Sequence, residues 1–216
     1  MHRIFYRYFL AFLPDLALRC ELARLCEVTG QSAKRVKAEY LHLTLCVVAE
    51  IDHRNRSIAH RLNSAFAEGL PPSCPIPLGN VAGSSGGAAI HTIGNIYEIR
   101  VFYKLLVRLI ANQQIFPMYR KSGLNPHVTL GYDRSEFKGF MLWEWIPAEL
   151  VLIESEVGRN VHNVLRRWPL DPPRQGSLPF DSGLPLHSRP DRIAYSRHYA
   201  SSPAKIRRSG PGRPIQ

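Results

Sequence analysis

The sequence predicts an α+β fold, and three observations lead to this class. Seven short apolar runs have the character of β-strands, three segments with helical periodicity lie among them, and short turns join some neighbouring strands. All of these segments fall within residues 1–170, which we expect to form one domain. A hydrophobic content of 45% is enough to build its core.

The N-terminal third is expected to contain a strand, a helix and a second strand. Residues 4–13 are aromatic and aliphatic and stop at Pro14, which indicates a buried strand. Asp15 can cap the amphipathic helix expected over residues 15–28, where apolar side chains recur at helical spacing. The next apolar run, residues 40–49, is predicted to be a strand.

The middle third alternates helices and strands. Helical spacing of apolar side chains predicts a helix over residues 58–66. Residues 74–81 are predicted to form an edge strand, because their prolines cannot donate to a central ladder, and residues 88–93 continue as a strand after a Gly/Ser loop. The most regular helical pattern covers residues 96–110 and follows a possible capping box that starts at Asn95.

Three further strands, at residues 128–132, 150–156 and 162–170, complete the predicted domain, with a glycine turn between the last two. The composition then changes. Residues 171–216 hold eight of the 17 prolines and no sustained hydrophobic period, so we expect a disordered, Pro/Ser/Arg-rich basic tail.

The charge of the chain suits phosphate-bearing partners such as RNA or nucleotides. The tail has eight Lys or Arg against three Asp, and so contributes +5 to the formal net charge of +11. The predicted domain is therefore basic in its own right. Arginines in the tail could add non-specific RNA affinity, although a solvated extension without a role is the simpler interpretation.

The remaining composition favours a cytoplasmic protein. No CxxC pair and no histidine at metal-ligand spacing accompanies the cysteines, so reduced core thiols are expected. The N-terminal apolar run is interrupted by Arg7 and lacks a small-residue cleavage site, which argues against a signal peptide. No stretch approaches the ~20 apolar residues of a membrane-spanning helix. No protein partner is evident.

Two segments, LHLTLCVV and PHVTLGY, share a His-x-Thr pattern, and their histidines are 85 residues apart. Alternate side chains of a strand face the same way, so His42 and Thr44 project from one face of the first segment. His127 and Thr129 repeat this arrangement in the second. A single His-x-Thr is usually structural, but two copies in similar apolar strands indicate a shared cleft.

These four side chains are suited to acid–base chemistry on a phosphate ester. Two imidazoles facing one cleft can divide the work, because near neutral pH one can be neutral and the other protonated. Threonine hydroxyls can donate hydrogen bonds to non-bridging phosphate oxygens as charge builds up in the transition state. No metal or other cofactor is then required. The other seven histidines, including His53, His60, His91 and His162, lack this setting and are interpreted as solvated or hydrogen-bonded.

On these motifs, the chain resembles the 2H phosphoesterase superfamily, and more narrowly the bacterial 2'-5' RNA ligase family, also called RNA 2',3'-cyclic phosphodiesterases. The opening FLAFLPD, the segments EYLHLTL and NPHVTLGY, and the closing LVLIESEVG and VLRRWPL carry the similarity, which covers residues 3–170. The resemblance implies a bilobal (LigT-like) fold, in which two related lobes of antiparallel sheet with flanking helices surround a central cleft.

The resemblance also implies an activity, namely the metal-independent hydrolysis of RNA 2',3'-cyclic phosphate ends to 2'-phosphates. Some members also join or cleave 2'-5' linkages reversibly. By this analogy His127 would be the base that activates water, and His42 the acid that protonates the departing 3'-oxygen. Thr44 and Thr129 would hold the phosphate. The partners would be RNA ends or nucleotides that carry a 2',3'-cyclic phosphate.

The sequence departs from this family at one position. Close relatives often carry a basic residue five positions after the second histidine, where this chain has Tyr132. Either Tyr132 contacts the nucleotide, with Arg134 two residues further on, or Arg120 or Lys121 before the motif meets the phosphate charge.

Two other functions are open on the sequence alone. The cleft could bind RNA or a nucleotide without significant catalysis, although binding needs no second histidine with its own threonine. Alternatively, the enzyme could act on a small cyclic nucleotide, a 2'-5' oligonucleotide or a cyclic phosphate of ADP-ribose.

Overall fold

The structure is a computed structural model, and its described residues are 4–29, 35–118, 124–132, 134–159 and 161–173. The tail predicted over residues 171–216 therefore lies outside the described residues except for its first three positions.

The described elements follow the predicted mixture of strands and helices. The strands are β1 (Tyr6–Phe12), β2 (Leu43–Ile51), β3 (Ile76–Ser84), β4 (Gly87–Thr92), β5 (His127–Gly131), β6 (Lys138–Trp145), β7 (Glu149–Glu156) and β8 (Val161–Pro169). The helices are α1 (Leu16–Thr29), the 3-10 helix η2 (Ala38–Tyr40), α2 (Ser57–Ala65) and α3 (Tyr97–Ala111). None of the described helices has both the length and the apolar character needed to cross a membrane.

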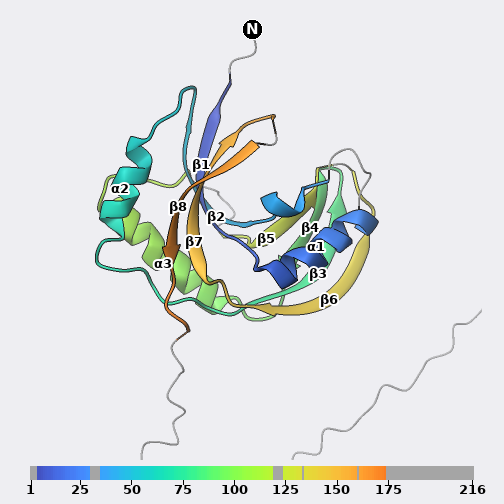
Figure 1. The fold of residues 1–216 in the computed structure, drawn as a ribbon. Helices are drawn as coiled ribbons and strands as arrows, with labels where there is room; N and C mark the ends of the chain where they lie inside the picture. Colours follow the sequence, from blue (N-terminus) through green and yellow to red (C-terminus); the bar gives the residue numbers. More distant parts are fainter. Residues whose placement is uncertain (1–3, 30–34, 119–123, 133, 160, 174–216) are drawn as a thin grey trace, which may run out of the picture. The chain divides into compact units, whose positions relative to one another are not determined.

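Within the described residues, eight strands form one antiparallel sheet in the order β6-β3-β4-β5-β2-β1-β7-β8. This order divides the sheet into two halves of four strands each. Helices α2 and α3 lie beside the half made of β1, β2, β7 and β8, and α1 lies beside the other half (Figure 1). The prediction of an α+β fold with two lobes of antiparallel sheet and flanking helices is confirmed.

Strand β1 is central to the first half, and its sequence reflects burial on both faces. Tyr8, Leu10 and Phe12 belong to the main core, while Phe9 and Ala11 are buried on the opposite face. A strand covered on both sides needs a continuous apolar run rather than an alternating one. This requirement explains why YFLAF precedes Pro14 without a polar interruption.

The two predicted helix starts differ in the structure. Asp15 caps α1 as expected, because its Oδ1 accepts the N–H of Leu18 at 2.8 Å. At α3, Asn95 accepts the N–H of Tyr97 at 2.9 Å, but the N-cap position is Ile96, whose side chain makes no capping hydrogen bond. The capping box predicted there is therefore wrong, although Asn95 still satisfies one N–H of the first turn.

The prediction that residues 74–81 form an edge strand is wrong. The corresponding strand, β3, lies between β6 and β4. Pro77 is tolerated because it is the second residue of the strand, where it lies opposite Glu144. The carbonyl oxygen of Pro77 still accepts the N–H of Ile93 at 3.0 Å. Placing proline inside the sheet therefore removes one N–H donor from the strand pairing, while its carbonyl acceptor is still used.

The sequence pattern did not predict β6, the strand that occupies this edge of the sheet. Apolar side chains do not alternate along it, and Phe140, Met141 and Leu142 are all exposed. The register with β3 is irregular between Leu78 and Asn80, because an advance of two residues along β3 corresponds to three residues along β6. Such an irregularity breaks the period of two by which strands are recognised in a sequence.

Candidate active site

The two His-x-Thr motifs meet where the two halves of the sheet join. His42 directly precedes β2 and His127 is the first residue of β5, and these two strands are neighbours in the sheet. They pair at Leu43 and Val128, both fully buried. The predicted strand over residues 40–49 therefore starts later than expected, because η2 ends at Tyr40.

The pairing of Leu43 with Val128 determines how the four polar side chains lie. Residues on either side of a buried strand residue point to the opposite face of the sheet. In an antiparallel pairing, the neighbours of the two central residues also lie opposite one another. His42 is thus beside Thr129, and Thr44 is beside His127, so each histidine is accompanied by the threonine of the other motif.

Both histidine rings are held in the same way. Nδ1 of His42 donates to the carbonyl oxygen of Tyr40 at 2.6 Å, and Nδ1 of His127 donates to that of Asn125 at 2.8 Å. A carbonyl can only accept, so each Nδ1 carries the hydrogen. Nε2 is then the nitrogen that can take a proton or, once protonated, give one. In each motif the backbone two residues before the histidine fixes this tautomer.

The environments of the two rings differ. Burial, helped by repulsion from the nearby His162 and His127, lowers the pKa of His42 from 6.5 to about 4, although the hydrogen bond to Tyr40 acts in the opposite direction. Its ring packs against Phe9, with centroids 4.9 Å apart. In the free protein, His42 is therefore neutral at neutral pH, with a lone pair on Nε2.

Two histidines that the sequence left without a role lie beside the motif histidines. The ring of His162, on β8, is edge-on to that of His42 at 5.3 Å between centroids. His91, on β4, pairs with His127, and their rings are 5.5 Å apart. Burial lowers the pKa of both His91 and His162. No local motif marks these positions, because they reach the site only through strand pairing.

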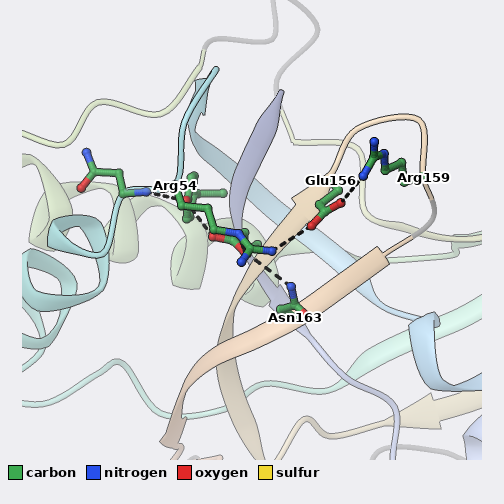
Figure 2. A network of polar contacts seen from close by, with 7 residues as sticks. Arg54, Glu156, Arg159 and Asn163 are labelled. Atoms are coloured by element: carbon green, nitrogen blue, oxygen red, sulfur yellow. Dashed lines mark hydrogen bonds and ion pairs between the residues drawn. The ribbon is translucent and has the colours of Figure 1, made fainter. Parts of the chain in front are cut away.

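A network of polar contacts that includes Arg54, Glu156 and Asn163 holds the start of β8 (Figure 2). Glu154, which is buried, accepts hydrogen bonds from the hydroxyl of Tyr8 at 2.8 Å and from Asn163 at 3.4 Å. Arg54 bridges Glu154 and Glu156 at 3.3 and 2.8 Å. Because Asn163 follows His162 directly, anchoring Asn163 on one face of β8 positions His162 on the other.

The predicted substrate contacts near the second motif are separated. Tyr132 follows β5 directly, is about half exposed and lines a pocket shared with His162. Arg134 is exposed and pairs with Glu136 at 2.9 Å. The alternatives for meeting phosphate charge, Arg120 and Lys121, lie outside the described residues.

Comparison with known proteins identifies the fold but no sequence family. No protein-family model matches the chain, and no curated protein is similar to it in sequence. Among solved structures, it is similar to E. coli LigT complexed with 3'-AMP, at 21% identity and a TM-score of 0.62, over 77% of this chain and 98% of that one.

Two further structures show the same likeness. Protein TT0787 of Thermus thermophilus matches at 16% identity and a TM-score of 0.63, over 77% of this chain and 99% of that one. The MHV ns2 PDE domain matches at 14% identity and a TM-score of 0.51, over 69% and 99%. E. coli LigT has also been solved with ATP and with NADP+. The chain therefore has the LigT-like 2H phosphoesterase fold.

Proposed function

We propose that this chain is an RNA 2',3'-cyclic phosphodiesterase, which hydrolyses cyclic phosphate ends to 2'-phosphates without a metal ion. The observation that carries the proposal is the meeting of two His-x-Thr motifs across one strand pair, each with its histidine in the Nδ1–H tautomer. The LigT-like fold and the basic charge of the chain support it.

In the proposed reaction, the Nε2 lone pair of His127 removes a proton from a water molecule as the oxygen attacks phosphorus. The bond from phosphorus to the 3'-oxygen breaks, and protonated His42 gives a proton to that oxygen. Thr44 and Thr129 donate hydrogen bonds to the non-bridging oxygens. The products are a 2'-phosphate and a 3'-hydroxyl. A 5'-hydroxyl that attacks in place of water would instead give a 2'-5' linkage.

His42 must gain its proton together with the substrate. Burial lowers its pKa to about 4, so the free protein carries no proton on Nε2 at neutral pH. An anionic phosphate beside the ring favours the charged form and offsets the effect of burial. Binding of inorganic phosphate at pH 7 should therefore take up protons, which calorimetry in buffers of different ionisation enthalpy detects. His42→Asn should lose this uptake.

The roles of the two histidines can be separated with a leaving group that needs no acid. If His42 is the acid, His42→Asn should lose most of its activity on cyclic phosphate but keep much of it on bis(p-nitrophenyl) phosphate. His127→Asn, without the base, should lose both. The opposite pattern would reverse the two assignments.

The experiment that tests the proposed function uses a short RNA with a 2',3'-cyclic phosphate end, in the presence of EDTA. The wild type should form a 2'-phosphate end, while His42→Ala and His127→Ala should not. His60→Ala, which removes an exposed histidine on α2, serves as the matched control. Binding of the RNA without turnover would favour a binding module or another phosphodiester, and small cyclic nucleotides and 2'-5' oligonucleotides would then be tested.

A cytoplasmic location is part of the same proposal. All four cysteines are free thiols, and three of them, Cys26, Cys46 and Cys74, are buried. Reduced thiols are typical of cytosolic proteins.

A further inference from the structure

A pocket of about 540 Å³ opens beside the candidate active site, and the proposed reaction leaves it without a role. Its walls come from α1, from residues 35–40, and from the single residues Tyr132 and His162. Pockets of this size bind small organic groups or parts of larger ligands. The ring of His162 contacts His42, so a ligand in this pocket would be continuous with a phosphate held at the two motifs.

The pocket has flat aromatic surfaces. The ring of Tyr40 lies 5.0 Å from that of His162, and Tyr132 is about half exposed at the rim. The thiol of Cys26 is neutral, because burial raises its pKa to about 11, and it adds to the apolar lining. Aromatic faces of this kind stack on nucleobases with little preference for sequence.

The pocket also carries positive charge next to the aromatic rings. Arg35 pairs through its backbone with Gly131, the residue before Tyr132, and it lines the pocket close to that tyrosine. Lys37 lines the same wall, with its Nζ 5.9 Å from the centre of the Tyr40 ring. Two carboxylates, Glu27 and Glu39, also line it, so the pocket is mixed in charge rather than purely cationic.

One buried polar atom at the pocket has no partner. Nδ1 of His162 makes no hydrogen bond to any of the residues that the structure describes. Buried polar atoms of side chains are nearly always hydrogen-bonded, and each exception needs an explanation. Since His162 lines the pocket, a ligand bound there would lie next to the ring that carries this nitrogen.

Resting on the proposed function, we propose that this pocket binds the nucleotide on the 5' side of the terminal cyclic phosphate. Its base stacks against Tyr132 and Tyr40 and hydrogen-bonds His162, while the phosphodiester that joins the two nucleotides meets Arg35. The chain is then an enzyme for the ends of RNA chains, and it acts poorly on mononucleotides. Arg35 supplies from a neighbouring segment the cation that the sequence lacks at Tyr132.

The test compares a dinucleotide that ends in a 2',3'-cyclic phosphate with the corresponding cyclic mononucleotide. We expect kcat/KM to be at least about tenfold higher for the dinucleotide, since stacking of one base on an aromatic side chain accounts for that much. Tyr132→Ala and Arg35→Gln should each reduce this ratio several-fold. Arg108→Gln, which removes an exposed arginine on α3, should leave the ratio as in the wild type.

The outcomes separate the pocket from the reaction. Equal kcat/KM for the two substrates in the wild type would overturn the pocket proposal and leave the proposed function intact. If neither substrate is hydrolysed, the proposed function fails, and calorimetry with the dinucleotide and mononucleotide 2'-phosphates then tests the pocket. The pocket proposal is supported if the dinucleotide 2'-phosphate binds more tightly than the mononucleotide and Arg35→Gln weakens this binding. Equal affinities would overturn the pocket proposal.

Discussion

The depressed pKa of His42 predicts how the stability of the fold depends on pH. Burial holds the folded-state pKa near 4 against an ordinary value of 6.5, so between these limits the unfolded chain binds a proton that the folded protein does not. The free energy of unfolding must therefore fall as pH is lowered through this range. At about 1.4 kcal/mol for each pKa unit, the loss is about 3 kcal/mol, of which about 2 kcal/mol is gone at pH 5.

Urea denaturation of the wild type and of His42→Asn between pH 7 and pH 4 measures this contribution. Asparagine does not titrate, so the variant should lose about 3 kcal/mol less stability over the range than the wild type does. His60→Asn, at an exposed position on α2, should follow the wild type. If His42→Asn and the wild type show parallel curves, His42 titrates normally in the folded protein, and the proton uptake proposed for phosphate binding loses its basis.

Four further substitutions probe the phosphate contacts, the polar network and the close approach of two strands. Thr44→Val and Thr129→Val should each reduce kcat by about 10- to 100-fold with little change in stability, because each removes one hydrogen bond to a developing charge. Tyr8→Phe removes a donor from buried Glu154 and should destabilise the protein by about 1–3 kcal/mol, seen as a fall of several degrees in Tm. Gly87→Ala should destabilise by about 2 kcal/mol or more, since its φ is +143° and a Cβ there would lie 2.2 Å from a carbonyl oxygen of β5.

Each of these predictions has its own control. Thr44→Ser keeps the hydroxyl and should recover much of the activity, whereas equal loss in the serine and valine variants would indicate a packing role. For Tyr8→Phe the control is Arg134→Gln, which breaks an exposed ion pair and should change stability by less than about 1 kcal/mol. Gly69→Ala has a positive φ but open space around it, so it should cost less than Gly87→Ala; equal costs would rule out the strand contact as the cause.

The parts of the site that depend on local sequence were predictable. His-x-Thr within an apolar run fixes which side chains share a face, and the structure places the two motifs on neighbouring strands, as the prediction of one cleft requires. Asp15 before a helical pattern likewise predicts its capping contact. These features need only the residues next to them in the chain.

The parts that depend on pairing between distant segments could not be predicted. His162 reaches His42 only because β8 pairs with β7 and β7 with β1, and a single sequence contains no sign of that register. Strand β6 could not be predicted for a related reason. Its apolar side chains do not alternate, because its pairing with β3 is irregular. Pro77 led to the wrong prediction of an edge strand, because a sheet tolerates one missing donor near the end of an interior strand.

The pairing of β1 with β7 also constrains when the protein can fold during synthesis. Tyr6 lies opposite Glu156, so the ribosome makes β1 about 140 residues before it makes the strand that fills this edge. Contacts of such long sequence separation slow folding. Until β7 emerges, Phe9 and Ala11 lack their contacts with Val151 and Ile153, and β1 offers a free apolar edge. A nascent chain stalled before Glu149 is therefore the form of this protein most exposed to aggregation.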